Sequence, residues 1–122
     1  MILVDTAVWI DHFHRSEPVL VRLLEQGAVA SHPMVVGELV LGSLKNRQEV
    51  VASLMAQHTV QVISDDEYLQ FVEDRRLMSR GLSYVDVHLL ASTLITPGTH
   101  LWTRDRRLHA VAEEAGVSWH AD

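Results

Sequence analysis

The sequence predicts an α/β fold of three layers, in which a central, mainly parallel sheet of four to five strands lies between helices. Short apolar runs alternate along the chain with longer segments of helical periodicity, which is typical of a parallel sheet covered by helices. The first run, residues 2–4, is apolar without alternation, as in a strand buried on both faces. With 122 residues, of which 48% are hydrophobic, the chain has material for one core, so a single domain over residues 1–122 is expected.

Strands are expected at five places, each a short run of apolar or β-branched residues bounded by polar residues or turn signals. The expected strands are residues 2–4, 28–31, 59–63, 100–103 and 117–119.

Helices are expected between these runs, beginning with one that follows Asp5 and carries Val8, Trp9 and Phe13 on one face. Ser64 and Ser83 each stand three residues before an acid, the spacing of a capping box at a helix start. The other expected helices are residues 18–26, 33–44, 46–57, 64–80, 83–95 and 106–115.

Composition excludes several classes of protein. The net charge of −6 argues against holding nucleic acid by overall attraction, although arginines gather within residues 75–80 and 104–107. Cysteine is absent, which excludes disulfides and thiolate metal sites. No apolar run approaches the ~20 residues that span a bilayer, and no signal-peptide pattern opens the chain. A cytoplasmic protein without membrane contact is therefore expected.

The first candidate site residue is Asp5, which directly follows the strand at residues 2–4 and precedes a helix. This position faces the ligand crevice in open α/β sheets. Asp5 and Thr6 are also good helix caps, so a purely structural role stays open.

Three further acids are candidate partners of Asp5. Glu38 lies among apolar helix neighbours, where a glutamate needs compensation unless it reaches solvent at a helix edge. Asp86 lies in the first turn of its helix, and Asp105 follows the strand at residues 100–103. Helix capping and dipole stabilisation are the structural alternatives for Asp86 and Asp105.

These acids share one expected location. Two end parallel strands and two lie on helices that follow other strands, so all can meet at the carboxyl edge of the sheet. Crowded carboxylates repel one another unless a cation is present, and an all-oxygen site suits Mg²⁺, with Mn²⁺ as a substitute. Such ions activate water and stabilise phosphoryl displacement, so metal-dependent nuclease chemistry is expected.

The same residues resemble a known family. Asp5-Thr6, Glu38, Asp86 within residues 81–91, and Thr103-Arg104-Asp105 look like the acidic positions and flanks of the PIN domain. Within that family the chain is most similar to the VapC toxins of bacterial toxin–antitoxin pairs, over its whole length. One departure is that arginines follow Asp105, where many members have an acid or lysine and then an aromatic, so no further acidic ligand is expected there.

The resemblance implies a Mg²⁺-dependent endoribonuclease that cleaves RNA phosphodiesters with a metal-activated water. It implies that Asp5, Glu38, Asp86 and Asp105 are catalytic and hold the metal. Thr6 and Thr103 would then orient carboxylates or contact phosphate, and Arg104 is a further candidate phosphate contact, with solvated surface arginine as its alternative. The implied partners are a small VapB-like antitoxin that covers or enters the active site, RNA, and a second copy in a homodimer, with promoter DNA bound only through the antitoxin.

Two other classes of α/β protein with an acidic pocket fit the sequence less well, and one alternative stays open. A phosphoacceptor receiver domain needs paired acids after the first strand and a late lysine, but Thr6 follows Asp5 and the sole lysine is Lys45. A phosphatase with an aspartyl nucleophile needs an acid where Ala7 stands. A non-catalytic PIN-fold binding module remains the alternative. The eight histidines show no H-E-x-x-H spacing, which favours structural or surface roles for them.

Overall fold

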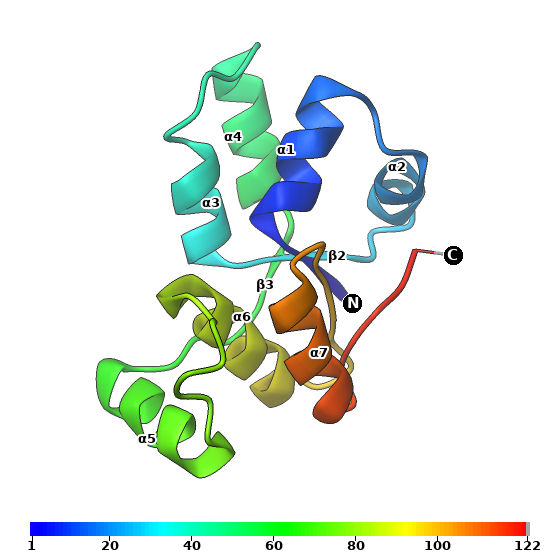
Figure 1. The fold of residues 1–122 in the computed structure, drawn as a ribbon. Coiled ribbons are helices and arrows are strands. Elements are labelled where there is room, and N and C mark those ends of the chain that lie inside the picture. Colours follow the sequence, from blue (N-terminus) through cyan, green and yellow to red (C-terminus); the bar gives the residue numbers. More distant parts are fainter. Residues whose placement is uncertain (122) are drawn as a thin grey trace.

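The computed structural model describes residues 1–121 and contains a four-stranded sheet between two layers of helices (Figure 1). All neighbouring strands are parallel, in the order β3-β2-β1-β4. The strands are β1 (Ile2–Val4), β2 (Val29–Ser31), β3 (His58–Thr59) and β4 (His100–Trp102). The predicted three-layer α/β/α class is therefore confirmed. The predicted domain also includes residue 122, which lies outside the described residues.

The helices divide between the two faces of the sheet in chain order (Figure 1). One layer holds α1 (Thr6–His14), α2 (Pro18–Glu25), α3 (Pro33–Leu39) and α4 (Arg47–Met55). The other holds α5 (Asp65–Arg75), α6 (Tyr84–Ile95) and α7 (Arg106–Glu114). In the part of the chain that the structure describes, no helix combines the length and apolar character that crossing a membrane requires.

The centre of the core is β1, which pairs with β2 on one side and β4 on the other. Leu3 is in register with Ala30 of β2 and Leu101 of β4, and Leu3 and Leu101 are fully buried. Helix α6 covers one face of this strand with a run of buried residues that includes Leu89 and Leu90. Burial on both faces explains the unbroken apolar run at residues 2–4.

Two expected strands, residues 59–63 and 117–119, are much reduced in the structure, whereas those at 28–31 and 100–103 each lose one residue. Residues 59–63 contribute only Thr59 to β3, because β2 ends at Ser31 and offers no further ladder partner beyond the bond from Val60 N to Ser31 O. Gln61 N instead bonds Thr96 Oγ1, 3.0 Å away. Residues 117–119 form a single parallel bridge between Ser118 and Leu101 rather than a strand.

Two expected helices also end five residues early. The helix predicted over 64–80 ends at Arg75, because Arg76 adopts a left-handed conformation with φ 52° and Leu77 N turns back to Val72 O. Leu77 is then buried at 6% exposure, and its burial stabilises this termination. The helix predicted over 33–44 ends at Leu39, where the guanidinium of Arg47 caps the carbonyl oxygens of Val40 and Gly42.

His32 is a buried histidine that links the sheet to both helix layers. It caps α3 by accepting a hydrogen bond from Met34 N at Nδ1, 3.0 Å away, and its Nε2 lies 3.1 Å from Ser92 Oγ on α6. Burial, with a smaller contribution from the neighbouring His88, lowers the pKa of His32 to about 4. The neutral imidazole is therefore the form that the fold accommodates.

We predict that His32 makes stability depend on pH. Its folded pKa lies below the unfolded value of about 6.5, so its contribution is complete above pH ~6.5 and is lost as the pH falls toward about 4. Urea unfolding of His32→Asn, which keeps a capping oxygen, should show a shallower loss of stability over this range, by on the order of 3 kcal/mol. His14→Gln, at an exposed position, is the control and should follow the wild type. An unchanged pH slope in His32→Asn would contradict this role.

Candidate active site

The acidic site is built around Asp5, which ends β1 and caps α1. Asp5 is only 8% exposed, and its backbone N still bonds Trp102 O of β4. Its Oδ1 accepts a hydrogen bond from Thr6 N at 2.7 Å, and its Oδ2 accepts one from Thr103 Oγ1, also at 2.7 Å. The carboxylate is thus fixed between the ends of β1 and β4, and helix capping accounts for one of its two bonds.

Burial raises the pKa of the Asp5 carboxyl above its ordinary value. The hydrogen bonds from Thr103 and Thr6 oppose this rise, and the negative charges of Asp86 and Glu38 add to it. The last two contributions show that Asp86 and Glu38 lie close enough to Asp5 for their charges to act on it. These three acids therefore share one electrostatic environment.

Glu38 reaches this site from α3, which packs against α1. The side chain is exposed, as the helix-edge alternative required, yet its Oε1 accepts a hydrogen bond from Thr6 Oγ1 at 2.6 Å. Thr6 consequently links two acids, with its backbone N on Asp5 and its hydroxyl on Glu38. The Glu38 carboxylate is therefore exposed to solvent and also directed toward the end of β1.

Asp86 enters from the first turn of α6, where it is half-buried. It forms a capping box with Ser83: Asp86 N donates to Ser83 Oγ at 3.1 Å, and Asp86 Oδ2 accepts from Ser83 N at 2.9 Å. Within residues 1–121, Asp86 Oδ1 makes no hydrogen bond, so it remains available to a ligand.

Asp105 is exposed and caps α7, with Oδ1 accepting from Leu108 N at 2.9 Å. Its backbone N donates to Thr103 Oγ1 at 3.0 Å, and the same hydroxyl donates to Asp5. Thr103 therefore connects Asp105 to the centre of the site. We call Asp5, Glu38, Asp86 and Asp105 the acidic cluster.

The acidic cluster is looser than a closed set of metal ligands. Among the described residues, the one group of three or more His, Asp or Glu whose ligand atoms all lie within 4.8 Å of one another lies elsewhere, on α7 and the C-terminal segment. The donors of the cluster are all carboxylate oxygens, the type that Mg²⁺ and Mn²⁺ prefer. A cation there would also offset the burial and the neighbouring negative charges that together raise the pKa of Asp5. The residues present fit such an ion.

The candidate phosphate contact Arg104 is held by two acids in this structure. Its guanidinium donates to Asp11 and, at 2.8 Å, to Glu17, and it lies 5.7 Å from the ring centre of Trp102. A phosphate contact from Arg104 would require these ion pairs to open.

The position of the Arg107 side chain could not be predicted from the sequence. Its side chain crosses Gly81, where a Cβ would meet Arg107 Cδ at 2.7 Å, and Gly81 has a φ of +78° that favours glycine. Gly81 opens the short loop that leads to Ser83 and Asp86. The arginine on α7 therefore lies against the segment that carries an acid of the cluster.

Comparisons with known proteins show the family to which the chain is related. A family model described as the PIN domain matches residues 2–114, a region that includes all of the acidic cluster. Two relatives are each 46% identical over 118 residues, which cover 97% of this chain and 95% of the relative. They are Ribonuclease VapC32 of Mycobacterium tuberculosis strain CDC 1551 / Oshkosh and Ribonuclease VapC32 of strain ATCC 25618 / H37Rv. No solved structure is significantly similar to the chain.

We predict that Asp5 lowers the stability of the metal-free protein at neutral pH. Because its folded pKa is raised, its favourable contribution exists only at low pH and is lost as the pH rises through that pKa. With a chelator present, Asp5→Asn should unfold at a higher temperature than the wild type at pH 7, and the difference should shrink on acidification. Asn keeps the cap of α1. Asp74→Asn on the surface of α5 is the control, and a lower midpoint for Asp5→Asn would show that the carboxylate is stabilising.

Proposed function

The chain belongs to the PIN-domain family, and from this premise we propose that it is a metal-dependent endoribonuclease that acts as the toxin of a VapBC-type toxin–antitoxin pair. The observation that carries the proposal is the buried Asp5 carboxylate, whose pKa is raised in part by the charges of Asp86 and Glu38. Such crowding costs stability, and a divalent cation would compensate it. The name of the 46% identical relatives, Ribonuclease VapC32, supports RNA as the substrate.

In this proposal Asp5, Glu38, Asp86 and Asp105 hold Mg²⁺, with Mn²⁺ as a substitute. When bound, the ion supplies Lewis-acid stabilisation of the phosphodiester and lowers the pKa of water. Asp5 supplies the most rigid oxygens, because both of its carboxylate oxygens are already oriented by hydrogen bonds. Each oxygen has a second lone pair, so these bonds leave Asp5 able to bind a cation.

The two threonines act as positioning residues. Thr103 Oγ1 donates to Asp5 and accepts from Asp105 N, so one hydroxyl sets the separation between the ends of β1 and β4. Thr6 links Asp5 and Glu38 with two different groups, because its backbone N donates to Asp5 and its hydroxyl donates to Glu38. Groups of this kind orient the residues that bind a metal and raise its affinity.

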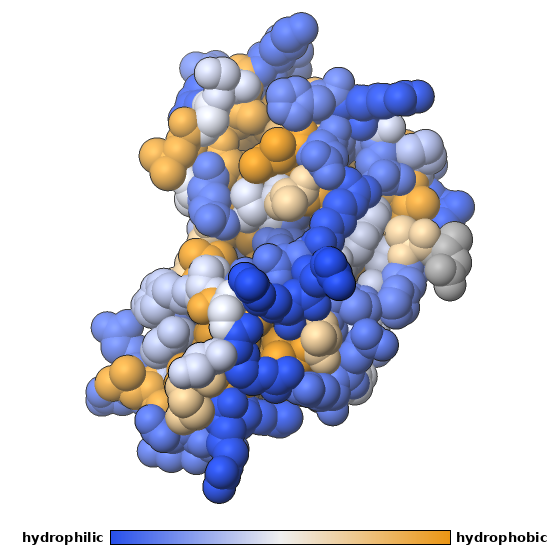
Figure 2. Space-filling model, in the orientation of Figure 1, coloured by the Kyte–Doolittle hydropathy of each residue, from blue (hydrophilic) through white to orange (hydrophobic). Residues whose placement is uncertain are grey.

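RNA binding would depend on local charge, because the chain as a whole carries −6. Figure 2 shows strongly hydrophilic side chains gathered at the centre of one face, around the N-terminal end of α7. Arg106 and Arg107 are exposed in this first turn of α7, next to Asp105. These cations would attract the phosphates of a single strand toward the acidic cluster.

The antitoxin would occupy an apolar depression of about 500 Å³ beside Glu38. Ile10 and Phe13 of α1 line it, and they remain 43% and 36% exposed. Apolar side chains are exposed over α1, α3 and α4 in Figure 2. A small VapB-like protein with an apolar segment fits this surface and would reach the active site through Glu38. The resemblance to VapC toxins supports a cytoplasmic homodimer that contacts promoter DNA only through the antitoxin.

A non-catalytic PIN-fold binding module is the second candidate. Asp5, Asp86 and Asp105 each cap a helix, and a chain without turnover would retain them for that reason. Replacement of an acid by its amide separates the two functions, because an amide still caps a helix but binds divalent cations poorly.

We predict that Asp5→Asn, Glu38→Gln, Asp86→Asn and Asp105→Asn each reduce RNA cleavage. Mutation of a residue that orients a metal ligand typically lowers metal affinity or activity ~10–100-fold. Loss of a ligand itself should therefore lower the cleavage rate at least ~100-fold, and Thr103→Val should lower it ~10–100-fold. Cleavage of a fluorescent RNA of mixed sequence and growth arrest on expression are the measurements. Asp66→Asn, an exposed acid on α5, is the matched control. Wild-type cleavage by Asp5→Asn would exclude the proposed active site.

We also predict that cleavage requires an added divalent cation. Dialysis against a chelator should abolish activity, and Mg²⁺ or Mn²⁺ should restore it, since an all-oxygen site suits these hard ions. Ca²⁺ is the control cation, because its larger radius and flexible coordination suit catalysis of phosphoryl transfer less well. Full activity in excess chelator would contradict metal dependence while leaving the fold assignment intact.

A further inference from the structure

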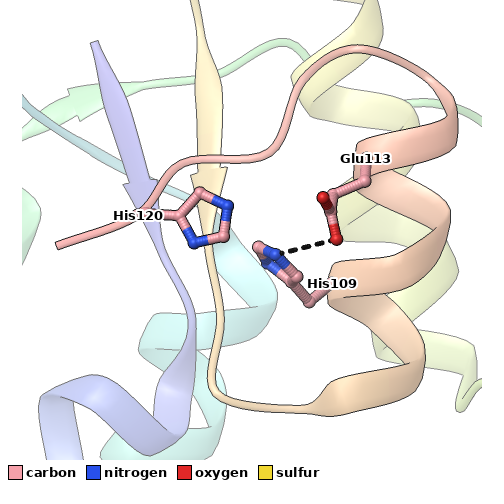
Figure 3. Close-up of side chains that lie close together, drawn as sticks. All are labelled: His109, Glu113 and His120. Atoms are coloured by element: carbon pink, nitrogen blue, oxygen red, sulfur yellow. Dashed lines mark ion pairs between the residues drawn. The ribbon is translucent and has the colours of Figure 1, made fainter. Parts of the chain in front are cut away.

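Three side chains of types that can bind a metal meet outside the acidic cluster, where α7 faces the C-terminal segment (Figure 3). His109 and Glu113 lie one turn apart on α7, with His109 Nε2 3.2 Å from Glu113 Oε1. The ring of His120 approaches from the segment after α7, 4.5 Å from the His109 ring between centres. All three ligand atoms lie within 4.8 Å of one another.

The position of His120 is set by the sheet. The segment that carries it pairs with β4: Leu101 N bonds Val117 O at 2.8 Å, and Trp119 N bonds Leu101 O at 3.0 Å. Trp119 also packs on Trp102, with ring centres 5.1 Å apart. His120 therefore follows an anchored residue, and its approach to His109 does not depend on an unattached chain end.

We propose that His109, Glu113 and His120 form a binding site for a borderline transition-metal ion of the zinc class, separate from the acidic cluster. Two imidazole nitrogens and one carboxylate oxygen are a donor set that Zn²⁺ takes and Mg²⁺ does not favour. Ligand atoms bound to zinc at ~2.0–2.1 Å in a tetrahedral site lie about 3.3 Å apart. The separation of 3.2 Å between His109 and Glu113 already matches one edge of that tetrahedron.

The surroundings leave the site accessible to an ion. Glu113 and His120 are exposed, and His109 is half-exposed. Among the described residues, His109 is the only ion-pair partner of Glu113. Arg80 pairs with Glu114 instead. Arg106, one turn before His109, is exposed, so water and salt screen its charge. With three protein ligands, the fourth position is left to water.

The site is joined to the acidic cluster by a shallow depression of about 420 Å³. His109 and His120 line one part of it, and Thr103 and Asp105 line another. An ion bound by His120 would hold the C-terminal segment against α7 and keep Trp119 packed on Trp102, directly before Thr103. We therefore expect bound zinc to fix the C-terminal segment against α7 and to make the side of the depression beside Asp105 more rigid.

The test is a titration of the chelator-treated full-length chain with Co²⁺, followed by absorption, and with Zn²⁺ in competition. The wild type should bind one Zn²⁺ that a large excess of Mg²⁺ does not displace. His109→Ala and His120→Ala should each weaken Zn²⁺ binding at least ~10-fold, and Glu113→Gln should weaken it as well. His14→Ala is the control for loss of an exposed histidine, and circular dichroism verifies that each variant is folded.

A parallel titration of Asp86→Asn separates the two sites. Zn²⁺ affinity that is retained in Asp86→Asn and lost in His120→Ala supports the proposal. Zn²⁺ affinity that is lost in Asp86→Asn and retained in His120→Ala assigns the ion to the acidic cluster and overturns it. Absence of Zn²⁺ binding in the wild type also overturns it, and neither result bears on whether the acidic cluster cleaves RNA.

Discussion

Burial of one carboxylate at the end of the central strand governs the arrangement of the rest of the site. Asp5 is almost removed from water, so its charged form is expensive unless nearby groups stabilise it. The hydroxyl of Thr103 and the amide of Thr6 do so in part, while Asp86 and Glu38 act in the opposite direction. The fold thus keeps mutually repelling carboxylates at the carboxyl edge of the sheet, an arrangement that proteins retain where function outweighs stability.

The parts of the fold that local pattern determines were predictable from the sequence. An unbroken apolar run identified β1, and capping-box spacing located the starts of α5 and α6, where Ser64 and Ser83 do form such boxes. Strand and helix ends were less predictable, because distant partners decide them. Thr59 ends β3 since β2 offers no further partner, and α5 stops where Leu77 enters the core.

The same distinction applies to the candidate site. Asp5 and Asp105 could be proposed because each stands between an expected strand and a helix, and parallel strands bring their carboxyl ends to one edge. The ion pairs of Arg104 join it to acids 87 and 93 residues away, which no local periodicity encodes. The approach of His120 to His109 likewise depends on a bridge to β4, although the four-residue spacing of His109 and Glu113 was a visible signal.

The order of the strands also determines the point in synthesis at which the sheet and the acidic cluster can assemble. The first strand made, β1, lies in the middle of the sheet and needs β4, and the hydrogen bond from Thr103 to Asp5 closes a loop of 98 residues. Contacts of such long range form late in folding because the entropy of closing the loop must first be overcome. A nascent chain therefore lacks the assembled acids until nearly all of it has left the ribosome.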